Sequence, residues 1–344
     1  MGTYLEDILS QPDQLERLFE AYSEEGFLRE KMKRLSEHKW GNIIFTGMGS
    51  SHFCAVGAGL YLKEKGIDNQ VVSTGELLYY EREIIKENTL LILISQSGES
   101  AETVKLLGKL PEQVFVVGIT NEPDSTLAKN SALVCPLLVD REESVTTRTY
   151  LASVCVCLWA ADAIAGGEGC DMTKKIRRGT ECLRKAVQQS KEYEGKIKEF
   201  AENCSAPAIM GRGYSMGSVA AGALFLREVA KIPAMEFDEA EFKHGPLEMV
   251  EKGFKAVILA PEGEGMLMNV RMAESIVKKG GEVLLITDGS CTALEEERLR
   301  IIRLERSEEA AAALFQIVPI QILANSLAKN RGICPGKFRW SSKV

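Results

Sequence analysis

The sequence has no Cys-x-x-Cys pair, no long apolar run free of charge and no excess of basic residues. Its nine cysteines are irregularly spaced, and Cys155 and Cys157 lie inside an apolar run, so we expect reduced core thiols and no disulfide framework. The most apolar stretch, 150–166, contains Asp162 and is short for a membrane span, which favours a buried helix. The net charge of −7 argues against nucleic-acid binding. The start lacks the basic and apolar regions of a secretion signal, so we expect a cytoplasmic protein.

An internal repeat relates residues 47–64 to residues 211–228. Six positions match without a gap: Gly47, Gly49, Ser51, Leu60, Leu62 and Glu64 correspond to Gly211, Gly213, Ser215, Leu224, Leu226 and Glu228. Each copy follows an apolar run and enters a helix-compatible stretch. A duplicated unit of strand, glycine turn and helix is typical of proteins that bind anions or nucleotides where strands end.

Apolar runs alternate with helix-compatible stretches along both halves of the chain, which is typical of buried parallel strands joined by helices. We predict an α/β protein of two tandem domains, each a five-stranded parallel sheet flanked by helices in a flavodoxin- or Rossmann-like three-layer sandwich. The predicted strands are 41–46, 70–73, 89–94, 113–119 and 133–138, then 206–210, 256–260, 282–287 and 300–304. The predicted divisions are N-terminal helices in 1–40, a first domain in 41–170, a helical connector in 171–202, a second domain in 203–330 and a tail in 331–344.

The sharpest motif is Ser95-Gln96-Ser97-Gly98-Glu99-Ser100, which follows a buried strand and precedes a helix predicted over 101–110. Its hydroxyls and backbone N–H groups would lie at a helix N-terminus, where an anion is favoured. Helix capping by Ser97 or Ser100 is the simpler alternative. The parallel turn Gly49-Ser50-Ser51 favours a phosphate site. Neither turn has the Gly-Lys-Ser/Thr of a P-loop or the third glycine of a dinucleotide fingerprint.

Three segments together resemble the sugar isomerase (SIS) domain family: Ser95–Ser100, Gly-Ile-Thr-Asn at 118–121, and Glu-Phe-Lys-His-Gly-Pro-Leu-Glu at 241–248. The resemblance covers roughly residues 40–344 and implies both domains of that family. It is strongest to the isomerase half of glucosamine-6-phosphate synthase, to fructosamine-6-phosphate deglycases and to related phosphosugar isomerases.

The resemblance implies a site for a sugar phosphate in the first domain. The phosphate would bind the side chains of Ser51, Ser95, Gln96, Ser97 and Ser100, and Ser50 would contact the sugar. The segment 143–150 resembles the next sugar-contacting loop of the family and implicates Val145, Thr146 and Thr147. This loop is one residue shorter than the family pattern, so which threonine meets the ligand stays open.

The resemblance also implies three catalytic residues. His244 would open the sugar ring and would come from the partner subunit of a homodimer, Glu228 would move a proton between C1 and C2, and Lys343, beside Ser342 in the tail, would meet the open-chain carbonyl. Histidine titrates near neutral pH and suits such a role. Glu228 is thirteen residues beyond Ser215, about 20 Å along one helix, so it would serve a site away from its own helix's N-terminus.

Two positions depart from the synthase pattern, because Ala221 and Phe225 stand where that enzyme has Glu and Lys. The chain also lacks an N-terminal cysteine nucleophile, and no glutaminase domain fits ahead of residue 40. We therefore expect a phosphosugar isomerase or deglycase that enolises a 6-phosphorylated amino sugar across C1 and C2, with no metal and no other cofactor. The alternatives are a glucosamine-6-phosphate deaminase, a non-catalytic phosphosugar sensor and a degenerate paralogue that binds without turnover.

Overall fold

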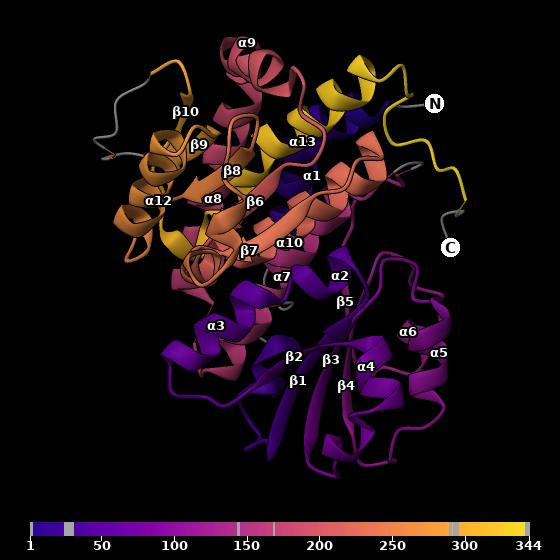
Figure 1. Cartoon of the computed structure of the whole chain (residues 1–344). Coiled ribbons are helices and arrows are strands. Elements are labelled where there is room, and N and C mark those ends of the chain that lie inside the picture. Colours follow the sequence, from indigo (N-terminus) through magenta and orange to yellow (C-terminus); the bar gives the residue numbers. More distant parts are fainter. Residues whose placement is uncertain are drawn as a thin grey trace. The chain divides into compact units, whose positions relative to one another are not determined.

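The computed structural model describes residues 3–23, 31–142, 145–167, 169–288, 291 and 296–340, in two compact units (Figure 1). The first unit contains Asp13–Arg141 and Thr146–Arg177, and the second contains 3–12, 142, 145 and 178–340. Each unit is built on one five-stranded parallel sheet with helices packed against it, so the predicted fold class is confirmed.

The sheet of the first unit has the strand order β2-β1-β3-β4-β5. Its strands are β1 (Asn42–Gly47), β2 (Gln70–Ser73), β3 (Thr89–Ile94), β4 (Phe115–Thr120) and β5 (Leu133–Pro136). β3 is buried at every position because apolar side chains face helices on both sides of the sheet, as its continuous apolar sequence predicts. The register places Gly47 at the end of β1 opposite Ile94 at the end of β3.

Helices α2 (Ser50–Phe53), α3 (Val56–Glu64), α4 (Thr74–Tyr79), α5 (Ala101–Leu107) and α6 (Thr126–Lys129) lie between these strands, and α7 (Arg148–Ile164) follows the last one. Two further helices, α1 (Tyr4–Ser23) and α8 (Cys170–Gln188), belong partly to each unit, because the division falls after Pro12 and after Arg177. α7 is buried along its whole length and packs on α3, which confirms that the most apolar stretch is a core helix. Its buried Asp162 accepts hydrogen bonds from the Tyr61 hydroxyl at 2.7 Å and from the Gly169 N–H at 3.1 Å.

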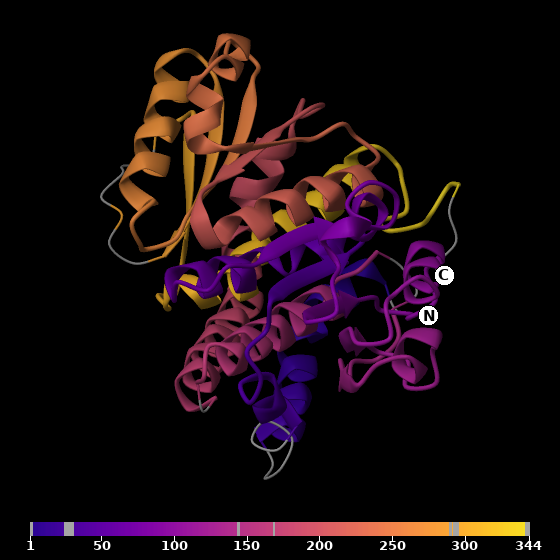
Figure 2. The same ribbon diagram turned by 90° about the horizontal axis from the view of Figure 1, so that it is seen from below.

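The sheet of the second unit has the order β10-β9-β8-β6-β7, which repeats the pattern of the first. Its strands are β6 (Ala208–Gly211), β7 (Met235–Asp238), β8 (Lys255–Ala260), β9 (Glu282–Asp288) and β10 (Leu299–Leu304). Its helices are α9 (Ser190–Ala201), α10 (Met216–Phe225), α11 (Glu239–Lys243), α12 (Met266–Lys278) and α13 (Ala313–Asn330). In Figure 2, α12 lies in orange along one face of this sheet, and it contacts β8, β9 and β10.

β7 is the one strand that the sequence did not predict. It is a four-residue edge strand in which Glu236 and Asp238 alternate with apolar residues, and none of its positions is fully buried. A continuous apolar run, which marks the other strands, is therefore missing from β7.

Gly98 fixes the loop that follows β3. Its φ of +63° lies in the left-handed region, and a Cβ at this position would stand 2.2 Å from the Ser125 hydroxyl oxygen. Ser125 caps α6 by accepting a hydrogen bond from the Ala128 N–H at 3.2 Å. The Ser95 hydroxyl in turn accepts from the Gly98 N–H at 3.1 Å. The serine loop and the start of α6 therefore depend on a residue without a side chain.

We expect Gly98→Ala to lower the free energy of unfolding by about 2–4 kcal/mol, because backbone strain adds to displacement of the α6 cap. Gly66→Ala is the matched control, since Gly66 has a φ of +73° and open space around its Cβ position. It should cost about 1–2 kcal/mol from strain alone. Denaturant unfolding of both variants measures the difference, and equal losses would contradict the steric argument.

Candidate active site

The two serine-rich turns of the first unit leave the sheet side by side. Gly47 and Ile94 are paired at the ends of β1 and β3, and the turns that carry Ser50–Ser51 and Ser95–Ser100 follow them directly. β2 lies on one side of β1 while β3, β4 and β5 lie on the other, so connections diverge between β1 and β3. Open parallel sheets bind ligands in the crevice at such a switch point. The topology thus brings the predicted phosphate residues together from two separate segments.

Hydrogen bonds hold the second turn in place. The Gln96 carbonyl accepts from the Asn121 N–H at 3.0 Å and from the Thr120 hydroxyl at 3.1 Å. The Ser100 hydroxyl donates to the Thr103 hydroxyl oxygen at 2.7 Å. The motif at 118–121 therefore supports this loop from the end of β4.

The side chains of these turns differ in exposure. Ser95 is buried, with 6% of its surface exposed. Five others are half-buried and accessible to a ligand: Ser50, Ser51, Gln96, Ser97 and Ser100. Gly47 makes the first turn possible, because a Cβ there would stand 2.5 Å from the Ser51 carbonyl oxygen. The two turns thus offer several neutral hydroxyl and amide groups at the carboxyl edge of the sheet.

The segment before α7 has one accessible side chain among its three predicted contacts. Val145 and Thr147 are buried, and Thr146 is half-buried. Thr146 is therefore the residue of this segment whose side chain can reach a ligand. Residues 143 and 144, which begin the predicted loop, lie outside the described part of the chain.

Glu228 lies on an unusual helical turn. After α10 the chain continues as a π-helical turn, Leu226–Ala230, and ends at Lys231 with a φ of +56°. π-helical turns are rare and occur frequently at functional sites. Glu228 is half-buried, and burial raises the pKa of its carboxyl group above the usual value, while Lys231 lowers it in part. A carboxyl group in this environment is suited to exchange protons closer to neutral pH.

Glu228 opens into a cavity of about 550 Å³, called here the Glu228 cavity. Its lining consists of the end of the π turn, the two residues after it and part of the tail: Arg227, Glu228, Lys231, Ile232, Pro233, Phe338, Arg339 and Trp340. The tail as far as Trp340 therefore lines the same cavity as the predicted proton-transfer residue. Ser342 and Lys343 lie outside the described residues.

Tyr4 is a neighbour of Glu228 that the sequence analysis missed. Its side chain is 2% exposed, and its hydroxyl has no hydrogen-bond partner within the described residues. Burial raises the pKa of Tyr4, and the carboxyl groups of Glu228, Glu142 and Asp7 raise it further. The apolar spacing of Tyr4 and Ile8, which are both buried, was the signal for a buried face.

His244 ends α11 and is exposed. Glu239 anchors this helix: its fully buried carboxylate pairs with Arg212 at 3.4 Å and with Lys243. Asp238 caps the helix by accepting from the Ala240 N–H at 2.7 Å. His244 is not among the described residues that line the Glu228 cavity. Within a single chain, the described residues therefore do not bring His244 and Glu228 together in that cavity. The supply of the partner subunit's His244 stays a prediction.

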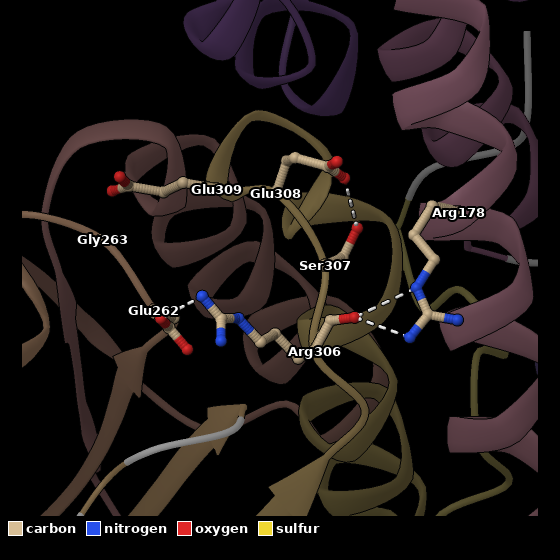
Figure 3. A pocket seen from close by; sticks show the side chains of 7 residues that line it. All are labelled: Arg178, Glu262, Gly263, Arg306, Ser307, Glu308 and Glu309. Carbon is tan, nitrogen blue, oxygen red and sulfur yellow. Dashed lines mark hydrogen bonds and ion pairs between the residues drawn. The ribbon is translucent and has the colours of Figure 1, made fainter.

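A second cavity of about 510 Å³ lies in the second unit (Figure 3). It is lined by Arg178, Glu262, Gly263, Arg306, Ser307, Glu308 and Glu309. Arg306 forms an ion pair with Glu262, and the Arg178 guanidinium donates to the Arg306 carbonyl oxygen at 3.0 and 3.2 Å. Since these charged groups already satisfy one another, the Glu228 cavity is the stronger candidate for substrate.

Within the described residues, no group of three or more His, Cys, Asp or Glu side chains could hold a metal ion, and no helix is long and apolar enough to cross a membrane. The described cysteines are free, and most are buried. Burial raises the pKa of the Cys135 thiol to about 12, so this thiol stays protonated and unreactive at neutral pH.

Comparison with known proteins gives matches over both sheets. The SIS domain family model matches residues 38–161 and 205–330. The glutamine–fructose-6-phosphate aminotransferase (isomerizing) of Pyrococcus horikoshii is 32% identical over 312 residues, which are 88% of this chain and 51% of that protein. The chain therefore spans about half the length of the curated relatives it matches.

Solved structures match over nearly the whole chain. The C-terminal domain of glucosamine-fructose-6-phosphate aminotransferase from Francisella tularensis has a TM-score of 0.85 at 20% identity, with 96% of this chain and 97% of that chain covered. The tagatose-6-phosphate ketose/aldose isomerase of Escherichia coli has a TM-score of 0.82 at 18% identity, with 99% and 98% covered. At these identities the two structures establish the shared fold.

We expect Glu239→Ala to loosen α11, because it leaves Arg212 and Lys243 without their shared carboxylate. The loss of stability should be about 1–3 kcal/mol, since both cations keep partial contact with water. Glu241→Ala, on the exposed side of the same helix, should change stability by less than about 0.5 kcal/mol. Hydrogen exchange of the amides of 239–244 reads out the local effect. Similar exchange in both variants would show that Glu239 does not anchor the helix.

Proposed function

This chain belongs to the SIS domain family, and we propose that it is a phosphosugar isomerase or deglycase acting on a 6-phosphorylated amino sugar. The observation that carries the proposal is Glu228, a carboxyl group on a π-helical turn that faces a cavity and has its pKa raised by burial. Such a group can both take up and return a proton. The names of the matched proteins support the substrate class, since those proteins are named for reactions of fructose 6-phosphate and tagatose 6-phosphate.

The phosphate is assigned to the two serine turns at the switch point of the first sheet. The proposed contacts are Ser51, Ser95, Gln96, Ser97 and Ser100, with Ser50 and Thr146 contacting the sugar. Hydroxyl and backbone N–H groups hold a phosphate without adding charge, which suits a chain with a net charge of −7. The remaining predicted contacts, Val145 and Thr147, are buried and serve to position this segment.

Glu228 is assigned the proton transfer. In the open-chain form of a fructosamine 6-phosphate, Glu228 takes the proton from C1, and an enolised intermediate forms across C1 and C2. Return of this proton to C2, together with transfer of the N–H proton to the C2 oxygen, gives an imine at C1 and a hydroxyl group at C2. Water adds to the imine, the C1–N bond breaks, and the products are the free amine and glucose 6-phosphate. Without loss of an amine, the same transfer interconverts an aldose and a ketose.

The other two predicted catalytic residues keep their proposed roles. The partner subunit's His244 opens the ring by returning a proton to the ring oxygen, so activity requires a homodimer. Lys343, with Ser342 beside it, meets the open-chain carbonyl. Transfer of an amide nitrogen is not supported by α10, because Ala221 and Phe225 are fully buried apolar residues at the positions of the synthase Glu and Lys.

We expect Glu228→Gln to lower kcat/KM by about 10²–10⁴-fold, because it removes the group that accepts the proton. The control is Glu64→Gln, which changes the exposed residue at the matching position of the repeat. Product analysis with glucosamine 6-phosphate and with the lysine adduct of fructosamine 6-phosphate distinguishes deamination from deglycation.

Several outcomes would contradict this assignment. Turnover that survives Glu228→Gln would exclude Glu228 as the proton-transfer group. If neither compound reacts and both raise the melting temperature, the chain is a phosphosugar sensor or a degenerate paralogue. Full activity of separated monomers would exclude the contribution of the partner subunit's His244.

The acid limb of the pH–rate profile should report Glu228. The carboxylate form is the active base, so kcat/KM rises as pH rises through its pKa, and burial places this limb above the pH of about 4.3 expected for an ordinary glutamate. Lys231→Met removes the cation that lowers the Glu228 pKa and should move the limb to higher pH. Measurement of kcat/KM against pH for both proteins tests the direction, and an unmoved limb would assign it to another group.

A further inference from the structure

The charged groups of the Glu228 cavity are mostly cationic. Arg227, Lys231 and Arg339 line it together with a single carboxyl group, Glu228. The chain as a whole carries a net charge of −7, so this excess of positive charge is local.

Arg227 is already neutralised by its neighbours. Its guanidinium pairs with Glu236 at 2.6 Å and donates to the Ala234 carbonyl oxygen at 2.7 and 3.0 Å. These bonds fix Arg227 at the edge of the cavity. The excess positive charge of the cavity therefore comes from the other two cations, with Glu228 as the one carboxyl group beside them.

Lys231 and Arg339 line the cavity close enough for their charges to interact, and Glu228 is the one carboxyl group of the cavity that acts on Lys231. The Lys231 ammonium donates to the main-chain carbonyl of Glu228, and Arg339 forms no ion pair within the described part of the chain. Burial lowers the pKa of Lys231, the charge of Arg339 lowers it further, and Glu228 raises it in part. Two like charges held close together are unfavourable unless an anion binds between them.

The backbone conformation of Lys231 determines the position of its side chain in the cavity. Its φ of +56° and ψ of +39° are left-handed, a conformation that is uncommon outside glycine and is often retained at functional sites. Its ammonium lies 5.9 Å from the centre of the Phe338 ring. Trp340, which is 96% exposed, adds an aromatic surface to the same cavity. The cations and aromatic rings of this cavity would together suit a ligand group that carries a negative charge next to apolar atoms.

We propose that Lys231 and Arg339 bind a carboxylate on the amine substituent, so that the preferred substrates are fructosamine 6-phosphates of amino acids. This inference rests on the proposed function, because it concerns the substituent of the same amino sugar. A free ammonium group, as in glucosamine 6-phosphate, would meet two cations there and be disfavoured. The sugar phosphate is a second possible anion for this pair, and the experiment separates the two.

The test uses two pairs of probes, the glycine adduct and the Nε-linked lysine adduct of fructosamine 6-phosphate, each with its carboxamide. Binding is measured by calorimetry to the Glu228→Gln protein, so that it does not depend on turnover. We expect at least one carboxylate probe to bind more tightly than its carboxamide, with a Kd lower by roughly 10- to 100-fold, and we expect both Lys231 and Arg339 to contribute to this preference. Adding Lys231→Gln or Arg339→Gln should remove most of this preference and leave carboxamide binding within about threefold.

Lys337→Gln is the matched control, since Lys337 is an exposed cation two residues before Arg339 and does not line the cavity. It should leave the preference intact. Equal losses for carboxylate and carboxamide in the cavity variants would show that these cations bind the phosphate, and no preference in either pair would also overturn the proposal. A preference without turnover in the unmutated protein would refute the proposed reaction and leave the carboxylate site standing.

Discussion

The parallel pairing of β1 with β3 is the constraint on which the proposed phosphate site depends. Since Gly47 lies opposite Ile94, the turns after both strands emerge at the same level of the same edge. Connections leave this point in opposite directions, which is where open parallel sheets bind their ligands. The close packing at Gly47 and Gly98 then fixes how each turn bends. A substitution at either glycine would therefore displace the hydroxyl groups of its turn.

The second sheet has the same strand order but uses its turns differently. The turn after β6 carries Arg212, and the turn after β8 carries Glu262. Arg212 pairs with the buried Glu239, and Glu262 pairs with Arg306. The charged side chains of both turns are therefore used in ion pairs within the protein. Duplication thus preserved the architecture of the sheet and changed the chemistry at its edge. The candidate catalytic residue of the second unit, Glu228, lies instead on the π turn that follows α10.

The sequence predicted the sheets well because their signal is local. β2 and β3 have the predicted limits, and the serine turns follow from where apolar runs stop. β7 escaped because it is short and alternating. The π turn over Leu226–Ala230 has the composition of an ordinary α-helix, and its extra residue becomes evident only with the left-handed Lys231 that ends it. Tyr4 and the tail meet Glu228 through contacts distant in sequence, which no local pattern encodes.

The neutral hydroxyls of the serine turns and the cations of the Glu228 cavity suggest separate sources for affinity and for selectivity. In the proposed site, neutral hydroxyls bind the phosphate that every hexose 6-phosphate carries, so they would not by themselves distinguish one such sugar from another. Full charges discriminate more strongly, because an unpaired or like charge in a partly buried cavity is costly. Lys231, which is half-buried, and Arg339, which is exposed, line the cavity beside Glu228, the proposed proton-transfer group. Selection by these cations would act on the group attached to the reacting carbon, where a wrong substituent also displaces the C1 proton from Glu228. Specificity and rate would then depend on the same few residues of one turn and one tail.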